Sequence, residues 1–314
     1  MPRIVDSHVH IIPDLLEKWG RSVTDGFLGQ ARKRARSWMR PFTESMHRAQ
    51  TFMRLLPEPA RKSFDRIGAI MPVPNLLVEG THEDLKEMMV EAGVAHSLII
   101  AHPPYVDSEM VLDLADEHPE FFAVVNIPSG TSRPGAVLKK YASRGARALK
   151  IHPAADGEGV DSPRYKALLK SAADLGLPVI IHTGCLHTHL LYKDPLQGQA
   201  QKFAPWFETY KDLRFILAHM NFHEPNIALD LAEEYPNLFV ETSWQPMEMI
   251  SEAVRRVGAE RVLFGSDWPL VGNNIKVGIK RVEDCVASGM MDRAQAELIL
   301  GENAFKLFEL GKAE

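Results

Sequence analysis

Residues 4–11 read IVDSHVHI, a short run in which apolar and polar residues alternate. A period of two is typical of a β-strand, where side chains two positions apart lie on the same face. Asp6, His8 and His10 would therefore project together, with Val5 and Val9 packed behind them. Two imidazoles directed at one point indicate a metal site, because imidazole is a frequent ligand of zinc, iron and nickel. For an isolated pair of this kind, two surface histidines on an edge strand are the alternative interpretation.

Apolar, β-branched runs like the first one recur along the chain, separated by segments with helical, amphipathic spacing. Alternating strands and helices are typical of a parallel sheet with crossover helices, and eight such units predict an α/β fold of the (β/α)8 TIM-barrel type. The length of 314 residues suits one such domain spanning residues 1–314. The eight runs cover residues 4–11, 96–101, 121–127, 147–152, 179–183, 214–219, 238–242 and 262–267.

An unusually long gap separates the first and second runs. Because the barrel unit needs far fewer residues, positions 14–80 are predicted to form a helical insertion at the catalytic face. Residues 17–66 hold twelve Lys or Arg against five Asp or Glu, although the whole chain has a net charge of -5. The run RKRAR at residues 32–36 is either an anion-binding patch or the solvated side of a lid helix.

The lid interpretation assigns functions to particular side chains of the insertion. Its apolar side would close over the barrel mouth or against a partner subunit, which makes a homodimer an expectation. An arginine of the insertion would clamp a substrate carboxylate with two parallel hydrogen bonds. The apolar side comprises Trp38, Phe42, Met46 and Met53, and the candidate arginines are Arg40, Arg48 and Arg54.

Overall composition narrows the class of protein. The net charge of -5 argues against general affinity for nucleic acid. Two cysteines a hundred residues apart, Cys185 and Cys285, do not form a disulfide framework and fit a reducing compartment. Neither a secretory leader nor an apolar stretch long enough to cross a membrane is recognisable in the sequence, so we expect a cytoplasmic protein without membrane contact.

Polar residues follow several of the predicted strands at the point where each strand leaves the core. They are His152, His182, His219 and Asp267. A single histidine at the end of a strand is most often a core residue whose ring nitrogens find hydrogen-bond partners. Packing alone does not explain why four predicted strands end in such a polar residue, in addition to the histidine pair of the first strand. In a closed barrel the carboxyl ends of all strands surround one mouth, so these side chains are predicted to converge there.

The set of motifs, taken in order, resembles the amidohydrolase superfamily. Within it, the set is similar to the amidohydrolase-related group of aminocarboxymuconate-semialdehyde decarboxylase, aromatic-acid decarboxylases and lactonases. Each motif alone is weak, but together they run nearly from end to end. They are DSHVH at residues 6–10, KIHP at 150–153, IHTG at 181–184, AH at 218–219, GSDWP at 265–269 and ILGENAFKLF at 299–308.

The resemblance implies a metal site and roles for its neighbours. One divalent metal, most often zinc with manganese as the alternative, would be bound by His8, His10, His182 and Asp267. Asp267 would also take a proton from the attacking water and return it later, and His219 would hold the nucleophile or the developing oxyanion. Asp6 is expected to make a supporting contact instead of binding the metal.

Lys150 leaves an alternative open. Binuclear members of the superfamily use a carboxylated lysine on the fourth strand to bridge two metals. We expect one metal, with Lys150, His152 and Trp268 contacting the substrate. For His102, and for His187 and His189, a solvated loop role is the main expectation.

The function predicted from these motifs is a metal-dependent hydrolase that attacks a small lactone, amide or ester with activated water. Its substrate would be a small molecule carrying a carboxylate. The close alternative is a metal-dependent, non-oxidative decarboxylase of an aromatic or muconate-type acid, which would use the same ligands. A non-catalytic barrel that binds a polyanion through its basic insertion is the alternative from another class.

Overall fold

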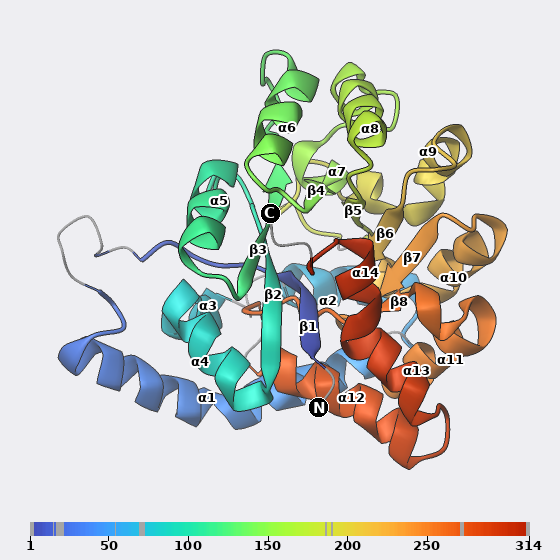
Figure 1. The fold of residues 1–314 in the computed structure, drawn as a ribbon. Helices are drawn as coiled ribbons and strands as arrows, with labels where there is room; N and C mark the ends of the chain where they lie inside the picture. The colour runs from blue at the N-terminus through green and yellow to red at the C-terminus, as the bar shows by residue number, and fades with distance from the viewer. Residues whose placement is uncertain are drawn as a thin grey trace.

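The computed structural model of the chain describes residues 3–14, 16, 22–53, 55–68, 73–185, 187–189, 191–270 and 273–311. Eight parallel strands stand in sequence order around a central axis, and helices surround them (Figure 1). The strands are β1 (Ile4–Val9), β2 (Val94–Ile100), β3 (Phe121–Asn126), β4 (Ala148–Ile151), β5 (Val179–His182), β6 (Phe215–Ala218), β7 (Leu238–Glu241) and β8 (Val262–Leu263). The predicted (β/α)8 barrel is therefore confirmed.

The predicted strands match the observed ones, with one clear difference at β8. The sequence predicts a strand over residues 262–267, but regular pairing with β7 ends at Leu263. Beyond it the chain turns toward β1: Ser7 N donates to Phe264 O at 3.0 Å and Asp267 N donates to His8 O at 2.8 Å. These bonds close the barrel and bring Asp267 beside the histidine strand.

Apolar side chains fill both sides of the strands, as expected for a parallel sheet that is covered on both faces. Inside the barrel, residues such as Val5, Leu98 and Ile180 form one buried cluster. A larger cluster lies between the strands and the outer helices. Because both layers are buried, polar side chains at the strand ends are the ones free to build a site.

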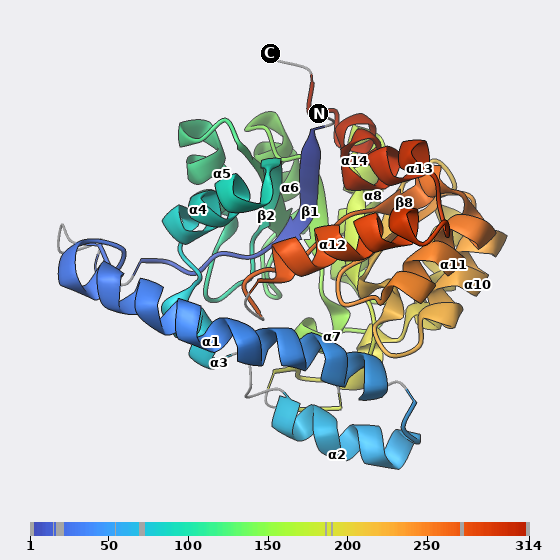
Figure 2. The ribbon, with the colours of Figure 1, turned by 90° about the horizontal axis from the view of Figure 1, so that it is seen from below.

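The helices follow the barrel order, apart from the insertion. They are α1 (Gly26–Met53), α2 (Glu58–Gly68), α3 (Val73–Val78), α4 (His82–Ala92), α5 (Ser108–Glu117), α6 (Pro134–Ser143), α7 (Pro153–Asp156), α8 (Pro163–Leu175), α9 (Ala204–Thr209), α10 (Pro225–Glu234), α11 (Met247–Val257), α12 (Asn274–Ala287), α13 (Arg293–Glu297) and α14 (Asn303–Leu307). Figure 2 shows α1 and α2 stretched across the side of the barrel on which α7 lies, the short helix that follows β4. The insertion therefore covers the end of the barrel where the strands finish. Among the described helices, none is long and apolar enough to cross a membrane.

The basic run of α1 pairs with the acidic face of α4. Arg32 contacts Asp84 at 2.8 Å, and Arg36 contacts Glu87 at 2.9 Å. Lys33 also pairs with Glu87. Arg36 is only 6% exposed, so this arginine does not belong to a solvated helix side or to an open anion-binding patch. Arg32, Lys33 and Arg36 instead fix α1 against α4.

Several expectations for the insertion fall outside the described part of the chain. Arg54 is not among the described residues, and the side chains of Arg40, Arg48, Phe42 and Met46 are not described either. Trp38 is 85% exposed and so does not close on the barrel mouth within this chain.

Candidate active site at the carboxyl ends of the strands

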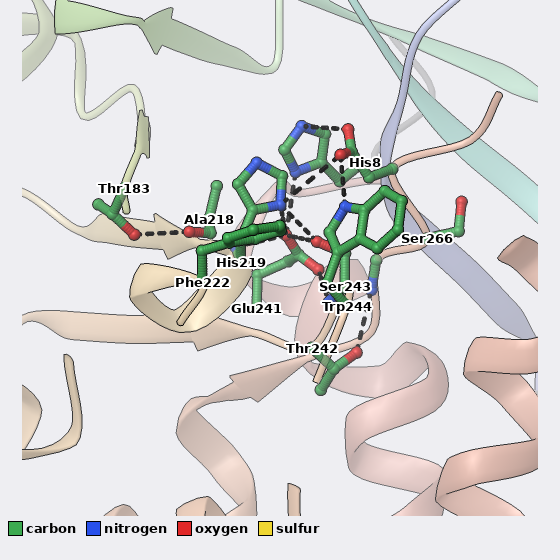
Figure 3. A network of polar contacts seen from close by, with 12 residues as sticks. His8, Thr183, Ala218, His219, Phe222, Glu241, Thr242, Ser243, Trp244 and Ser266 are labelled. Atoms are coloured by element: carbon green, nitrogen blue, oxygen red, sulfur yellow. Dashed lines mark hydrogen bonds and ion pairs between the residues drawn. The ribbon is translucent and has the colours of Figure 1, made fainter. Parts of the chain in front are cut away.

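The polar side chains at the strand ends come together at one mouth of the barrel. His8 lies near the end of β1, His182 and Glu241 are the last residues of β5 and β7, and His219 directly follows β6. All four are buried. Figure 3 shows His8, His219 and Glu241 directed toward one another from their separate strands. Convergence at the strand ends, predicted from the sequence, is thus observed.

Two groups of described donors lie close enough together to hold a metal: besides His8, His219 and Glu241, there is the group of His8, His10 and Asp267. Asp267 Oδ1 lies 3.6 Å from His8 Nε2 and 3.4 Å from His10 Nε2. Ligand atoms of these three residues all lie within 4.8 Å of one another, as a metal site requires. Asp267 Oδ1 is buried and has no hydrogen-bond partner among the described residues.

Glu241 organises the residues behind this group. It lies 3.0 Å from His8 Nδ1 and accepts hydrogen bonds from His219 N at 3.1 Å and Ser243 Oγ at 2.9 Å. A carboxylate on Nδ1 favours the tautomer whose Nε2 lone pair is free for a metal. The sequence analysis missed Glu241, although it occupies the same strand-end position as the residues that were selected.

Trp244, which the sequence analysis also missed, holds the second oxygen of Asp267. Its indole N–H donates to Asp267 Oδ2 at 2.7 Å. Both residues have left-handed backbone conformations, with φ of 66° for Trp244 and 59° for Asp267. Such conformations are uncommon for residues other than glycine and cluster at functional sites. No sequence signal identifies this contact, because it depends on the turn after β7 meeting the turn after β8.

His219 sits beside the donor group. Its Nδ1 lies 2.6 Å from Ser243 Oγ and 3.9 Å from Asp267 Oδ2, and its ring centroid is 4.8 Å from that of His8. Burial lowers the pKa of His219 to about 4, so the imidazole is neutral near pH 7. A neutral, fixed imidazole next to a carboxylate is suited to hold a reacting oxygen.

His182 lies next to these donors but belongs to neither of the two groups. Its ring stacks on that of His152 with centroids 3.8 Å apart and lies 5.0 Å from that of His219. His182 Nε2 is buried without a hydrogen-bond partner in the described chain. His152 accepts a hydrogen bond from Ala155 N at 3.2 Å at the start of α7, which fixes the stack.

Lys150 reaches the same centre from β4. Its Nζ lies 3.3 Å from His8 Nε2, and the side chain is buried. Burial lowers the pKa of Lys150 to about 8. Lys150 thus brings a cationic side chain to within 3.3 Å of one of the possible metal ligands.

Trp268 lies behind the site. It is completely buried, and its indole N–H donates to Glu79 from the insertion. Asn75 donates a hydrogen bond to Pro269 O at 2.7 Å, so the insertion is bound to the segment that follows Asp267. A direct contact of Trp268 with substrate stays a prediction.

Asp6 joins the first and last strands. Its Oδ1 accepts hydrogen bonds from His8 N at 3.2 Å and Ser266 N at 2.9 Å. Burial raises the pKa of Asp6 to about 7. The side chain supports the two segments that carry His8 and Asp267.

The weaker histidine candidates differ from one another. The ring of His102 lies 5.7 Å from that of His10 and 5.8 Å from that of His152, at the wall of the site. His187 pairs with buried Asp65 of α2 at 3.1 Å. Neither side chain is a freely solvated loop residue, whereas His189 is exposed as expected.

The electrostatics of the site fit a divalent metal. Burial, followed by the effect of Lys150, holds the pKa of His8 well below its ordinary value, and burial does the same for His182. Burial acts to raise the pKa of Asp267, but the effects of His219, His10 and Trp244 prevail and lower it. Neutral imidazoles and an ionised carboxylate are the forms that bind zinc and manganese.

The sequence profile of the family described as Amidohydrolase matches residues 5–310. The chain belongs to the amidohydrolase family. The match covers all the strand-end residues described above, and the protein is thus an enzyme of that family. A search of curated proteins gives no match for the amidohydrolase chain.

Solved structures of similar fold include decarboxylases and a hydrolase. A 5-carboxyvanillate decarboxylase from Sphingomonas paucimobilis matches with 12% identity and a TM-score of 0.64, over 98% of this chain and 99% of that one. A dihydroxybenzoic acid decarboxylase from a Polaromonas species, with bound manganese and 2-nitroresorcinol, matches with 16% identity and a TM-score of 0.64, over 100% and 98%. A probable 2-pyrone-4,6-dicarboxylic acid hydrolase from Acinetobacter baumannii matches with 13% identity and a TM-score of 0.59, over 98% and 100%. At these identities, the likeness concerns the fold.

Proposed function

We propose that this amidohydrolase is a metal-dependent hydrolase of a small lactone, amide or ester. One divalent ion, zinc or manganese, would be held by His8, His10, His182 and Asp267. The observation that carries the proposal is the convergence of His8 Nε2 and His10 Nε2 on a buried Asp267 oxygen that has no hydrogen-bond partner among the described residues. When bound, the metal lowers the pKa of a water molecule and polarises the substrate carbonyl.

Asp267 is the proposed proton carrier. It is ionised, because its pKa lies below the ordinary value, and it therefore accepts a proton from the attacking water. Trp244 keeps Oδ2 fixed through the 2.7 Å hydrogen bond, so the carboxylate does not rotate. The proton then passes from Asp267 to the leaving oxygen or nitrogen.

His219 and Glu241 are proposed to hold the developing oxyanion and the ring of His8 in place. Ser243 Oγ at 2.6 Å fixes the ring of His219, which remains neutral and stabilises the developing oxyanion. Glu241 fixes the ring of His8 through Nδ1. Second-sphere carboxylates of this kind raise the basicity of the imidazole that they orient.

Lys150 and His152 are the proposed substrate contacts. Lys150 supplies a buried cation, which suits a carboxylate on the substrate. Because Lys150 Nζ lies 3.3 Å from His8 Nε2, a carboxylate bound by this lysine would lie beside the reacting carbonyl. Trp268 is proposed as a further contact with the substrate.

The decarboxylase alternative is favoured by the rings around the site. His102 and His152 lie with ring centroids 5.8 Å apart, and Tyr192 lies 5.3 Å from His152. Such a wall suits a planar, conjugated acid. In that reaction the carbon would be protonated after carbon dioxide leaves, and Asp267, which is ionised, would deliver that proton after first accepting it from a substrate hydroxyl or from water.

The experiment that separates the reactions uses zinc-loaded and manganese-loaded enzyme. Release of acid from 2-pyrone-4,6-dicarboxylate and from simple γ-lactones measures hydrolysis, and release of carbon dioxide from 2,6-dihydroxybenzoate measures decarboxylation. We expect hydrolysis that is lost in Asp267→Asn and retained in Asp161→Asn, a matched change at a side chain 94% exposed. Carbon dioxide release without hydrolysis would favour the alternative, and no turnover in either assay would contradict both.

The remaining expectations concern the whole molecule. We propose a single catalytic domain over residues 1–314 with residues 14–80 as its insertion, acting as a homodimer in the cytoplasm. Exposed Phe27, Trp38 and Phe52 on α1 support a subunit contact. We propose no nucleic-acid partner, because Arg32, Lys33 and Arg36 pair with α4. Sedimentation velocity with and without double-stranded DNA tests both points.

A further inference from the structure

The four residues that directly follow β6, which we call the left-handed turn, all have a positive φ. The values are 61° for His219, 46° for Met220, 60° for Asn221 and 52° for Phe222. None of these residues is a glycine, and a side chain is disfavoured in this conformation because its Cβ approaches the following carbonyl oxygen. Strained backbone of this kind persists only where the surrounding structure holds it, and it clusters at functional sites.

Gln245, in the loop after β7, joins the two ends of the left-handed turn. Its Nε2 donates hydrogen bonds to His219 O at 2.6 Å and to Phe222 O at 3.2 Å. Phe222 N also donates to His219 O at 2.7 Å, so the ends of the turn meet at the amide. Because both neighbours of the amide are carbonyl acceptors, only its NH2 group fits between them.

The burial of Gln245 shows that these two bonds are its main contribution. The side chain is completely buried, and its Oε1 has no hydrogen-bond partner in the described part of the chain. A buried amide oxygen without a partner lowers stability. The amide is therefore placed for the two hydrogen bonds that it donates to the left-handed turn.

The loop that carries Gln245 contacts His219 at a second point, the ring. Ser243 Oγ lies 2.6 Å from His219 Nδ1, while Gln245 binds the main-chain carbonyl of the same histidine. Arg281 of α12 fixes this loop, since its guanidinium donates to Gln245 O at 2.9 Å. One loop thus holds both the ring and the main chain of His219.

Contacts with β5 reach other parts of the same segment. Asn221 N donates to Thr183 Oγ at 3.0 Å, and Thr183 Oγ donates to Ala218 O at 2.6 Å, one residue before the turn (Figure 3). These bonds hold the middle of the left-handed turn and the residue in front of it. The bridge between the carbonyls of its two ends comes from Gln245.

We propose that Gln245 is a positioning residue, which holds the left-handed turn so that His219 presents its ring to the reacting oxygen. The proposal rests on the role of His219 in the proposed function and adds the residue that sets its backbone. Without the bridging amide, the turn would relax toward negative φ, and the ring would leave its place beside Asp267, 3.9 Å away. Displacing a catalytic group by about 1 Å is enough to slow a reaction strongly.

Gln245→Met tests the proposal, because methionine has nearly the same shape and donates no hydrogen bond. In zinc-loaded enzyme, kcat should fall about tenfold or more while KM stays within about twofold, since His219 acts on the developing oxyanion and not on the bound substrate. Gln245→Asn keeps an amide but withdraws it by one methylene group. This milder variant should show the same loss of kcat.

Asn303→Leu is the matched control for a purely structural role. Asn303 Nδ2 also bridges two backbone carbonyls, those of Ala259 at 2.7 Å and Val262 at 2.8 Å. Val262 begins β8, so this bridge lies at the end of the barrel opposite the site. Asn303→Leu should lower the midpoint of thermal unfolding and leave kcat unchanged.

Proton–nitrogen NMR correlations of the imidazole rings give a readout that needs no turnover. In zinc-loaded enzyme with isotope-labelled histidine, the His219 ring signals are identified by their loss in His219→Gln. They should shift in both Gln245 variants and stay in place in Asn303→Leu. Unchanged His219 signals, an unchanged kcat in the folded Gln245 variants, or an equal loss of kcat in Asn303→Leu would overturn the proposal. Shifted signals in an enzyme that turns over no tested substrate would support it while contradicting the proposed function.

Discussion

The indole N–H of Trp244 donates to Oδ2 of Asp267 at 2.7 Å, which leaves Oδ1 to face the first-strand histidines. The two oxygens of this carboxylate thus have different partners: Oδ2 accepts the indole hydrogen bond, and Oδ1 faces the histidines. Trp244 follows β7 and Asp267 follows β8, so neighbouring strand ends fix this arrangement.

Trp244→Phe should lower kcat by about tenfold or more while the metal content stays the same. The change removes one charge-assisted hydrogen bond and lets Asp267 rotate. Steady-state kinetics and elemental analysis of the same preparation check this. Trp206→Phe is the control, because it removes an indole bond to Val160 O, at 3.0 Å, in the outer helices. Equal kcat values for the Trp244 variant and the wild type would contradict the positioning role.

His182→Ala tests the metal site and the number of metals. We expect about one metal per wild-type chain, which falls severalfold in the variant because a ligand is lost. Inductively coupled plasma mass spectrometry measures both values after dialysis. A wild-type ratio near two would instead support a second metal bridged by Lys150. Full metal content in His182→Ala would remove His182 from the ligand set.

Glu241→Gln should weaken metal binding by about 10–100-fold without unfolding the protein. Burial raises the pKa of Glu241 to about 8, so a cation at the site would be needed to hold it ionised near pH 7. Glutamine keeps the shape of Glu241 but can never become the carboxylate that faces His8 Nδ1, 3.0 Å away. Competition with a fluorescent chelator gives the affinity, and circular dichroism checks the fold. Glu158→Gln, at a partly buried carboxylate outside the site that accepts from Arg164, is the control and should bind metal normally.

Asp65→Ala tests how α2 is held over the barrel mouth. Asp65 accepts hydrogen bonds from His187 N at 2.9 Å and lies 3.2 Å from His223 Nε2, so one carboxylate joins α2 to the loops after β5 and β6. Cys185 and Glu224 lie near the same cluster. The variant should lose about 1–3 kcal/mol of unfolding free energy near pH 7.

The loss in Asp65→Ala should depend on pH. Burial acts to raise the pKa of Asp65, but hydrogen bonds from His223 and His187 prevail and hold it below the ordinary value of 3.8. A lowered pKa in the folded state adds stability at pH values above 3.8, and this stability disappears as the pH falls through the folded value. Urea unfolding at pH 7, 5 and 3 should therefore show a difference between wild type and variant that narrows only at pH 3. A difference that is the same at all three values would contradict this account.

The sequence by itself determined the barrel and most of its mouth. Apolar runs followed by His182, His219 and Asp267 are local patterns, and strand ends of a parallel barrel meet at one side whatever the loops do. The same rule would have selected Glu241, which ends β7 as His182 ends β5.

Only the tertiary structure decided how these residues touch. Arg36 pairs with Asp84, 48 residues further along the chain, and Asp65 pairs with His187, 122 residues further along. Trp244, in the turn after β7, donates a hydrogen bond to Asp267, in the turn after β8. Such pairs depend on backbone turns and on the docking of the insertion. A local pattern fixes which face a side chain occupies, but the packing of separate elements fixes the partner that it finds there.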